Sequence, residues 1–481
     1  MTSNEARIFE INNLDINTLE NNIYPLLEPT ARQELVCNYH PDYLETGKKA
    51  LDIGPNRGER MAAELVDLLQ ADYHSPHPTR TEKTDLLIIG SGAAGIAAAL
   101  ESQGKGKRVM LLSAANIGSS NSVLAQGGMA AAVGPDDSPE LHAKDTMIGG
   151  QTNVPQLVKI MAEEGPEVVY WLKNLGLPFD RNNDGNFRLI GGAGHSRKRV
   201  LTCKGLIGPR LMKTLLKALK TSDVEVYPNQ QLSGLWVNHK GDKAYCRGAY
   251  LFDQKQQEYI GIEAGAAILA TGGMGALKPY GLSTNNNATI RGEGLIAAYR
   301  TGIKLKDMNS NQFHPTGVLW PPEVQGMLVS EGVRTLGAAL YNRDGRQFVN
   351  PMETRDVVTA AILKEIIEGR GLNTIDSKVG VLLGNHLLPE ETLKNSLGRI
   401  YSKLKAAGYN PAKTPLIVSP VYHYQNGGIE IDENGKTTLA GLWAAGEVTG
   451  GVHGKNRLGG NALTDALVFG RRAARNTLLS L

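Results

Sequence analysis

Two glycine-rich segments of this chain enclose the lone histidines and arginines that could do chemistry. The first reads Gly90-Ser91-Gly92-Ala93-Ala94-Gly95, and the second covers residues 446–463, near the C-terminus. One such turn alone says little. Two such turns at opposite ends of a chain, with lone basic residues between them, are typical of a dinucleotide pocket. Distant parts of the sequence then form the two sides of that pocket.

The first glycine segment stands inside a β–α–β pattern. Residues 85–89 are a short apolar run typical of a buried parallel strand, residues 96–100 open a helix, and residues 108–112 form the next strand. In this context the backbone N–H groups of the turn and the helix N-terminus are expected to meet a pyrophosphate. Two further strands are predicted, at residues 266–270 and 441–447.

Ser113 stands at the end of the second strand, where a dinucleotide-binding unit usually places an acidic residue. The missing carboxylate weakens an interpretation as an NAD site, because the ribose hydroxyl groups lose their usual partner. A serine hydroxyl can still contact a ribose or a phosphate, so a dinucleotide remains compatible with the sequence.

The composition limits the class of protein. The 481 residues can bury a large core, and 41% of them are hydrophobic. The formal net charge is +3, so we expect no nucleic-acid partner. Cys37, Cys203 and Cys246 form no Cys-x-x-Cys pair, so we expect no metal site and a reducing compartment. The sequence shows no signal peptide and no apolar stretch long enough for a transmembrane segment, so we expect a cytoplasmic protein.

Further motifs lie between and within the two glycine segments. They are Ala-Gln-Gly-Gly at 125–128, Arg-Gly-Glu-Gly at 291–294, Gln-Phe-His-Pro-Thr-Gly at 312–317, Ser-Glu-Gly-Val-Arg at 330–334, Glu-Thr-Arg-Asp-Val-Val at 353–358, Tyr-His-Tyr-Gln-Asn-Gly-Gly at 422–428 and Lys-Asn-Arg-Leu at 455–458. In this order, from about residue 84 to the end, the chain resembles the fumarate reductase/succinate dehydrogenase flavoprotein family, which includes L-aspartate oxidase. The C-terminal run most resembles the flavin domain of soluble flavocytochrome-type fumarate reductases. Ser113 and residues 125–128 resemble the succinate dehydrogenase and aspartate oxidase branch.

The resemblance implies FAD as the cofactor. The implied contacts are Gly90, Ser91, Gly92, Ala93, Ala94, Gly95, Ser113, Ser120, Asn121, Gln126, Gly127, Gly128, Thr271, Gly272, Glu293, Glu447, Ala462 and Leu463. In the membrane-bound relatives a histidine five residues before the Gln-Gly-Gly motif binds FAD covalently. Asn121 stands at that position here, so non-covalent FAD is expected. Glu293 stands where the family commonly has aspartate and is expected to take the same role.

The resemblance also implies a small dicarboxylate substrate. Its implied contacts are His314, Ser330, His423 and Arg457, and its implied catalytic residues are Arg355, Glu331 and Arg334. A guanidinium group binds a carboxylate through two parallel hydrogen bonds, so fixed arginines suit such a substrate. The resemblance implies that the flavin delivers hydride to one alkene carbon and that Arg355 protonates the other, with Glu331 and Arg334 returning its proton.

Several other charged residues receive a plain structural interpretation. Glu323, Asp344 and Glu353 are expected to be solvated or to lie in turns. His195 is kept as a weak candidate for a flavin contact, and His386, which lies in no motif, is expected to be structural.

The predicted fold is an α/β, Rossmann-like FAD-binding domain with an inserted α+β capping domain and a small helical N-terminal extension. Residues 1–80 are expected to form the partly helical extension, 81–317 and 416–481 the FAD-binding domain, and 318–415 the cap. The helical domain that succinate dehydrogenases and aspartate oxidases carry beyond the Asn-Arg motif is not expected in this sequence.

Four functions stay open at this stage. The favoured one is reduction of fumarate or a similar unsaturated dicarboxylate, or the reverse oxidation of succinate. The first alternative is an L-aspartate oxidase-like activity that yields iminoaspartate. The second is a flavoprotein subunit that passes electrons to or from a partner docking on residues 1–80. The third is an acrylate-type substrate with a single carboxylate.

Overall fold

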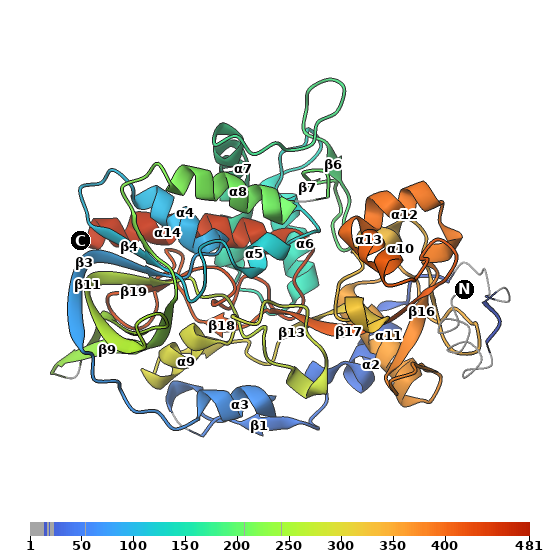
Figure 1. Cartoon of the computed structure of the whole chain (residues 1–481), viewed down its shortest axis with the longest axis horizontal. Helices are drawn as coiled ribbons and strands as arrows, with labels where there is room; N and C mark the ends of the chain where they lie inside the picture. The colour runs from blue at the N-terminus through green and yellow to red at the C-terminus, as the bar shows by residue number, and fades with distance from the viewer. Residues whose placement is uncertain (1–13, 17–18, 20–23, 53, 206, 242) are drawn as a thin grey trace. The chain divides into compact units, whose positions relative to one another are not determined.

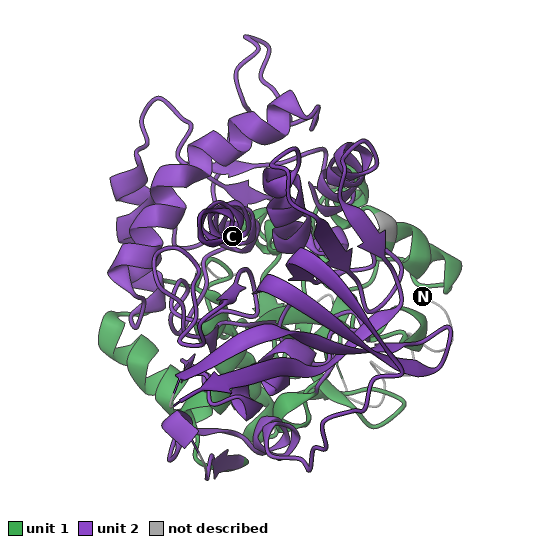
Figure 2. Cartoon of the chain, turned by 90° about the vertical axis from the view of Figure 1, so that its left-hand side faces the viewer, with its two compact units in different colours: residues 1–47, 278–285, 312–423 green, residues 48–277, 286–311, 424–481 purple. Residues whose placement is uncertain are grey.

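The computed structural model describes residues 14–16, 19, 24–52, 54–205, 207–241 and 243–481 (Figure 1). The chain divides into two compact units (Figure 2). Unit 1 comprises Met1–Gly47, Lys278–Asn285 and Gln312–His423, and unit 2 comprises Lys48–Leu277, Asn286–Asn311 and Tyr424–Leu481. The expected cap at residues 318–415 lies within unit 1.

Unit 2 is built on a seven-stranded sheet with the order β8-β4-β3-β11-β10-β9, in which β19 also pairs with β11. Its strands are β3 (Arg80–Ile89), β4 (Val109–Leu112), β8 (Glu225–Tyr227), β9 (Gln230–Lys240), β10 (Lys243–Asp253), β11 (Glu258–Leu269) and β19 (Leu442–Ala444). Strands β8, β4, β3, β11 and β19 run parallel, whereas β9 and β10 are antiparallel. The first half of β11 pairs with β10 and its last residues pair with β19, so the sheet forks there.

Helices form the other main part of unit 2. They are α3 (Ala63–Leu69), α4 (Ala93–Ser102), α5 (Asn121–Leu124), α6 (Pro139–Gly150), α7 (Pro155–Asn174), α8 (Ile207–Leu219), α9 (Glu293–Arg300) and α14 (Asn461–Ser480). Helices α4, α8 and α14 gather on one side of the sheet (Figure 1). Helix α8 buries Leu211, Leu215 and Leu219 at a spacing of four, as an amphipathic helix does.

Helix α4 can lie against α14 because both are built from small residues at their contact. A Cβ atom added at Gly470 of α14 would lie 2.4 Å from the Ala94 carbonyl oxygen of α4. Only glycine allows such a close approach of two backbones. The predicted β–α–β unit is therefore present, with α4 between the parallel strands β3 and β4.

Small strand pairs complete unit 2. β1 (Lys48–Ala50) pairs with β2 (Arg60–Ala62), β12 (Leu305–Lys306) pairs with β18 (Gly428–Ile429), and β7 (Val200–Leu201) lies between β5 (Met129–Ala130) and β6 (Leu189–Ile190).

Unit 1 contains a second sheet, with the order β13-β17-β16-β14 and β15 beside β16. The strands are β13 (Asn311–Trp320), β14 (Leu340–Tyr341), β15 (Leu372–Asn373), β16 (Val379–Leu383) and β17 (Leu416–Gln425). The helices are α2 (Pro29–Tyr39), α10 (Glu331–Thr335), α11 (Arg355–Ile367), α12 (Glu390–Leu397) and α13 (Arg399–Ala406). The apolar residues of α10, α11, α12 and α13 form one buried cluster with the sheet, and Val358, Ile362 and Leu382 lie within it. Val36 of α2 lies in a separate cluster.

In the part of the chain that the structure describes, no helix is long and apolar enough to cross a membrane. Among the same residues, no group of three or more His, Cys, Asp or Glu side chains is arranged to hold a metal ion.

Candidate functional site

The first glycine turn joins β3 to α4 and leaves no room for side chains. Gly90 has φ of +117°, and a Cβ atom there would lie 2.1 Å from the Ala270 carbonyl oxygen. A Cβ atom at Gly95 would lie 1.7 Å from the Gly90 carbonyl oxygen. The turn therefore requires glycine at both positions, and it presents backbone N–H groups and a helix N-terminus, which suit a phosphate.

Four serines lie in or next to this turn. The Ser91 hydroxyl donates to the Ser113 hydroxyl at 2.7 Å, and both side chains are buried. The Ala93 N–H donates to the Ser122 hydroxyl at 3.0 Å. The Ser120 hydroxyl is buried and has no hydrogen-bond partner among the described residues. A buried polar atom normally finds a partner, so this hydroxyl next to Gly92 fits a polar ligand such as a phosphate or a ribose.

The candidate contacts Asn121 and Glu447 lie together in unit 2. The Asn121 amide donates to Asn286 Oδ1 at 2.6 Å and its oxygen accepts from the Asn287 N–H at 2.9 Å, so its orientation is determined at both ends. Glu447 Oε1 accepts from the Gln425 N–H at 3.1 Å. Loss of solvent raises the pKa of Glu447 to about 7, although hydrogen bonds from Gln425 and Asn121 oppose this rise. The Glu447 carboxyl can therefore be neutral near neutral pH and donate a hydrogen bond to a hydroxyl group.

The Gln126-Gly127-Gly128 segment lies next to the turn before α14. Strand β5 begins directly after it, and the Ala130 N–H donates to the Gly460 carbonyl at 3.2 Å. Gly460 has φ of +88° and precedes Ala462 and Leu463 on α14. Residues 126–128 and residues 462–463 are far apart in the sequence. The structure nevertheless brings these predicted cofactor contacts to the same side of unit 2.

The remaining predicted cofactor residues also lie close to one another. Thr271 and Gly272 follow β11, and Glu293 is the first residue of α9. A Cβ atom at Gly294 would lie 2.1 Å from the Thr271 hydroxyl oxygen, so α9 begins in direct contact with the end of β11. Gln231 donates to Glu293 at 3.4 Å, and loss of solvent raises the pKa of the Glu293 carboxyl.

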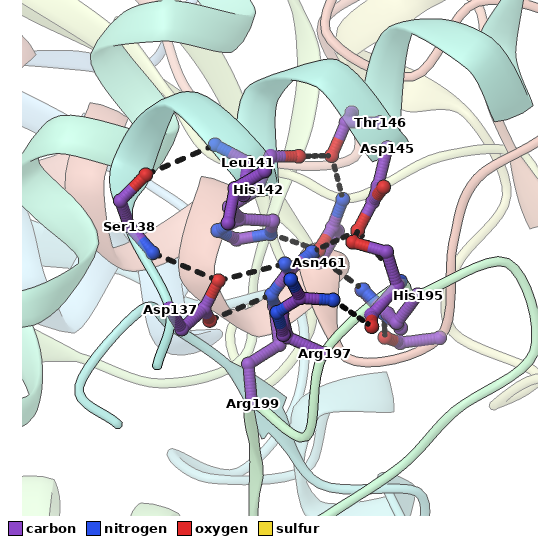
Figure 3. Close-up of polar contacts among 12 residues, drawn as sticks. Asp137, Ser138, Leu141, His142, Asp145, Thr146, His195, Arg197, Arg199 and Asn461 are labelled. Carbon is purple, nitrogen blue, oxygen red and sulfur yellow. Dashed lines mark hydrogen bonds and ion pairs between the residues drawn. The ribbon is translucent and has the colours of Figure 1, made fainter. Parts of the chain in front are cut away.

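A buried charged network supports the turn before α14 (Figure 3). The Arg199 guanidinium, which is fully buried, pairs with Asp137 at 2.8 Å and with Asp145 at 2.7 Å. It also donates to His195 Nδ1 at 3.2 Å. Because arginine has no acceptor, His195 Nδ1 must be unprotonated, and the proton lies on Nε2. His195 Nε2 then donates to the Gly459 carbonyl at 2.8 Å.

Helix α6 contacts Asn461, which follows this turn as the first residue of α14. His142 Nε2 lies 2.9 Å from Asn461 Oδ1, and the Asn461 amide donates to the Thr146 hydroxyl at 2.9 Å. Burial lowers the pKa of His142 to about 4, so this histidine is neutral. His195, expected from the sequence as a weak flavin contact, is thus placed as a support of the turn that leads into Ala462 and Leu463.

Unit 1 contains a row of three charged side chains, which are the predicted catalytic residues. Arg355, the first residue of α11, has Nε 3.0 Å from Glu331 Oε2, and Arg334 Nη2 lies 3.6 Å from the same oxygen. The Arg334 side chain is 1% exposed, and loss of solvent lowers its pKa to about 10, opposed by the Glu331 charge. A carboxylate between two guanidinium groups offers a route for proton exchange between them.

Strand β13 aligns this row with a predicted substrate histidine. Arg355 Nη1 donates to Gln312 Oε1 at 3.0 Å. Side chains two residues apart on a strand share a face, so His314 follows Gln312 on the same face of β13. The His314 ring lies edge-on to the His423 ring of β17, with 5.5 Å between centroids. Arg355, His314 and His423 therefore lie on one side of the unit 1 sheet.

Ser330 and Arg457 complete the predicted substrate contacts, in different units. Ser330 is the N-cap of α10, where its hydroxyl accepts from the Gly332 N–H at 3.3 Å. Arg457 is buried in unit 2, with its guanidinium 4.3 Å from the centroid of the Tyr424 ring. A second buried pair lies nearby in sequence, where His453 Nε2 is 3.2 Å from Asp465.

The sequence interpretation missed several residues of this arrangement. Gln312 and Arg199 were assigned no role, although Gln312 stands two residues before His314, which a strand pattern could have indicated. Glu353, expected to be solvated or to lie in a turn, lies in the turn before α11, but its side chain is 1% exposed and pairs with Arg32 at 3.1 Å. Glu323 and Asp344 are exposed.

The chain is similar to known proteins over most of its length. A family model described as an FAD binding domain matches residues 85–463. A fumarate reductase (CoM/CoB) polypeptide of Methanothermobacter marburgensis is 37% identical over 411 residues, covering 82% of this chain and 73% of that protein. An L-aspartate oxidase of Streptomyces coelicolor is 33% identical over 415 residues, covering 83% of this chain and 69% of that protein.

Among solved structures, a quinol fumarate reductase chain of E. coli is similar, with a TM-score of 0.77 and 30% identity. The match covers 84% of this chain and 71% of that chain. Together these similarities confirm the predicted α/β FAD-binding fold and the predicted FAD cofactor.

Proposed function

Because the chain belongs to the fumarate reductase/succinate dehydrogenase flavoprotein family of FAD-dependent oxidoreductases, we propose that it reduces the carbon–carbon double bond of a fumarate-like dicarboxylate. The same site would catalyse the reverse oxidation of succinate. FAD, when bound, supplies the two-electron redox chemistry of this reaction.

The row of Arg355, Glu331 and Arg334 is the observation that carries the proposal. Reduction of an alkene requires a proton donor for the second carbon, and Arg355 stands at the end of this row. Guanidinium is a weak acid in water, but a nascent carbanion is far more basic and can take its proton. Glu331, 3.0 Å from Arg355, then takes a proton from Arg334 and passes it to Arg355, and Arg334 regains its proton from water.

We further propose that four side chains hold the two carboxylates of the substrate. Arg457 and His423 bind one of them, and His314 with Ser330 binds the other. Arginine and histidine donate charge-assisted hydrogen bonds to carboxylates. Asn121, whose amide has no nucleophilic ring nitrogen, supports non-covalent FAD.

An anaerobic experiment tests the proposal. The purified holoprotein is reduced with dithionite and mixed with fumarate, and the return of the oxidised flavin absorbance is followed. Rapid reoxidation that Arg355→Gln abolishes, with FAD content unchanged, supports the proposal. Absence of reoxidation in the wild type contradicts it.

The same preparation separates the alternatives. Bleaching of the oxidised flavin by L-aspartate, without reoxidation by fumarate, would show an aspartate oxidase activity instead. Reoxidation by an acrylate-type monocarboxylate at the same rate as by fumarate would contradict the dicarboxylate clamp. Docking of an electron donor or acceptor on residues 1–80 stays a prediction, which cross-linking to a redox partner would test.

A further inference from the structure

The N-terminal part of unit 1 precedes the region that the family model matches, and it packs on the helix that carries Arg355. Val36 of α2 is buried in a cluster with Val357 and Ala360 of α11. At the other end of α11, the Tyr39 hydroxyl donates to Glu368 at 2.6 Å. Helix α2 therefore lies along α11 from its first turn to its C-terminal end.

Glu353, two residues before Arg355, is bound by this N-terminal part from two directions. Its Oε1 accepts from the Leu27 N–H at 2.6 Å, and its Oε2 lies 3.1 Å from Arg32 Nε. The Glu353 side chain is 1% exposed. A carboxylate is buried to this extent only when its charge is compensated, so both contacts are required to retain Glu353 in this position.

The turn before α11 has further contacts to the N-terminal part and to α10. The Asn350 amide donates to the Tyr24 carbonyl at 2.6 Å, and the Glu353 N–H donates to the Asn350 carbonyl at 3.1 Å. On its other side, Arg334 donates to the Pro351 carbonyl at 2.6 Å. The backbone that leads into Arg355 is thus held by residues 24–32 and by a residue of the proposed proton route.

The same N-terminal part also covers the reverse face of β13. The His40 ring lies edge-on to the Phe313 ring, with 5.6 Å between centroids. Phe313 alternates with Gln312 and His314 along the strand, so its side chain points to the opposite face. Residues 24–47 therefore contact α11 and β13 on the sides that Arg355 and His314 do not use.

We propose that residues 24–47 are a positioning segment for Arg355, and that Glu353 is the positioning residue through which the segment acts. The role given to Arg355 rests on the proposed function. Thr354, the N-cap of α11, is the one residue between Glu353 and Arg355. Loss of the Glu353 contacts loosens the first turn of α11 and shifts the guanidinium relative to Glu331 and Gln312.

This role predicts an effect on turnover rather than on substrate binding. A misplacement of about 1 Å in a catalytic group can lower a rate about 100-fold. Glu353 contacts none of the proposed substrate residues, so kcat is expected to fall while KM stays within about twofold.

The test uses the full-chain holoprotein and the variants Glu353→Ala and Glu353→Gln. Glu323→Ala is the matched control, because Glu323 is an exposed acid of the same unit. Amide hydrogen exchange is measured over residues 24–32 and 350–360, and fumarate kinetics are measured in parallel. A double variant with Arg355→Lys shows whether the two residues act through one another.

In Glu353→Ala we expect exchange in both segments to rise about tenfold or more and kcat to fall by a similar factor. Glu353→Gln retains an acceptor for the Leu27 N–H and is expected to lie between Glu353→Ala and wild type. In the Arg355→Lys background, Glu353→Ala is expected to have little further effect on kcat.

Two results would overturn the proposal. One is exchange in Glu353→Ala that equals exchange in Glu323→Ala. The other is an unchanged kcat in a variant that has only lost stability. If Glu353→Ala does not fold, Glu353→Gln and Arg32→Gln provide the same comparison. If the wild type does not reduce fumarate, the proposed function fails, and the exchange data alone decide whether residues 24–47 hold the start of α11.

Discussion

Arg355 and Glu331 form an ion pair of 3.0 Å across 24 positions of the sequence, and the same Glu331 oxygen lies 3.6 Å from Arg334. The two arginines differ in exposure. The Arg355 side chain is 11% exposed, whereas Arg334 is 1% exposed and has its pKa lowered to about 10 by burial. Burial therefore eases the release of a proton by Arg334, which suits the inner position of a proton route.

Glu331→Gln keeps the shape of this row and removes its negative charge. The two arginines then face each other without a carboxylate between them, and the return of a proton to Arg355 is blocked. We expect repeated turnover of fumarate to slow by about 100-fold, with FAD content unchanged. Steady-state oxidation of an excess of a reduced dye measures this rate. Glu323→Gln serves as the control, and equal rates in the two variants would argue against a role of Glu331 in proton transfer.

Arg457→Met removes a cation from the proposed clamp while keeping an unbranched apolar side chain over the Tyr424 ring. A hydrogen bond to a charged group contributes about 1.5–3 kcal/mol, so the Kd for a dicarboxylate is expected to rise at least about tenfold. Titration of the oxidised holoprotein with succinate, followed by the shift of the flavin absorbance, gives this constant. An unchanged Kd would place Arg457 outside the substrate site.

Arg199→Leu leaves the buried carboxylates of Asp137 and Asp145 without their common cation. Removing one partner of a buried ion pair typically lowers the free energy of unfolding by about 3–5 kcal/mol. Lys159→Met is the control, because the Lys159–Glu163 pair is exposed and its loss costs at most about 1 kcal/mol. Urea unfolding compares the two variants. A similar small loss in both would mean that the Arg199 network contributes little to stability.

Glu447 predicts a pH dependence of stability in the flavin-free protein. Its pKa is raised from 4.5 to about 7, so the folded state favours the protonated carboxyl. Its stabilising contribution is complete below pH 4.5 and is lost as the pH rises through 7. The loss is on the order of 3 kcal/mol. Relative to wild type, Glu447→Gln is therefore expected to gain unfolding free energy between about pH 5 and about pH 8, as measured by urea unfolding. A difference that does not vary with pH would contradict the raised pKa.

The sequence was sufficient for the parts of the fold that depend on local signals. The glycine turn at residues 90–95 and the apolar runs beside it predicted the β–α–β unit, which the structure confirms as β3, α4 and β4. The strand β3 begins earlier than expected, at Arg80, because its polar first half pairs with β11. Residues 80–84 are mostly polar, and their pairing with a distant strand leaves no apolar pattern in the sequence. The early start of β3 could therefore not be predicted from these residues.

The burial of Glu353 shows why other parts could not be predicted. A glutamate close to proline and asparagine is usually solvated, and nothing near Glu353 in the sequence indicates a partner. Its partners Leu27 and Arg32 stand more than three hundred positions earlier. The same holds for Arg199, which lies in a basic stretch that resembles a solvated loop, whereas Asp137 and Asp145 come from another part of unit 2.

The division into two units has a consequence for how such a chain can diversify. The chain passes between the units after Gly47, Leu277, Asn285, Asn311 and His423, so neither unit is a continuous piece of sequence that could be exchanged by a single recombination event. All proposed flavin contacts belong to unit 2, whereas unit 1 holds most of the residues proposed to bind or protonate the substrate, namely His314, Ser330, Glu331, Arg334, Arg355 and His423. Selection on unit 1 can therefore change which acid is accepted, while the flavin-binding residues of unit 2 stay as they are.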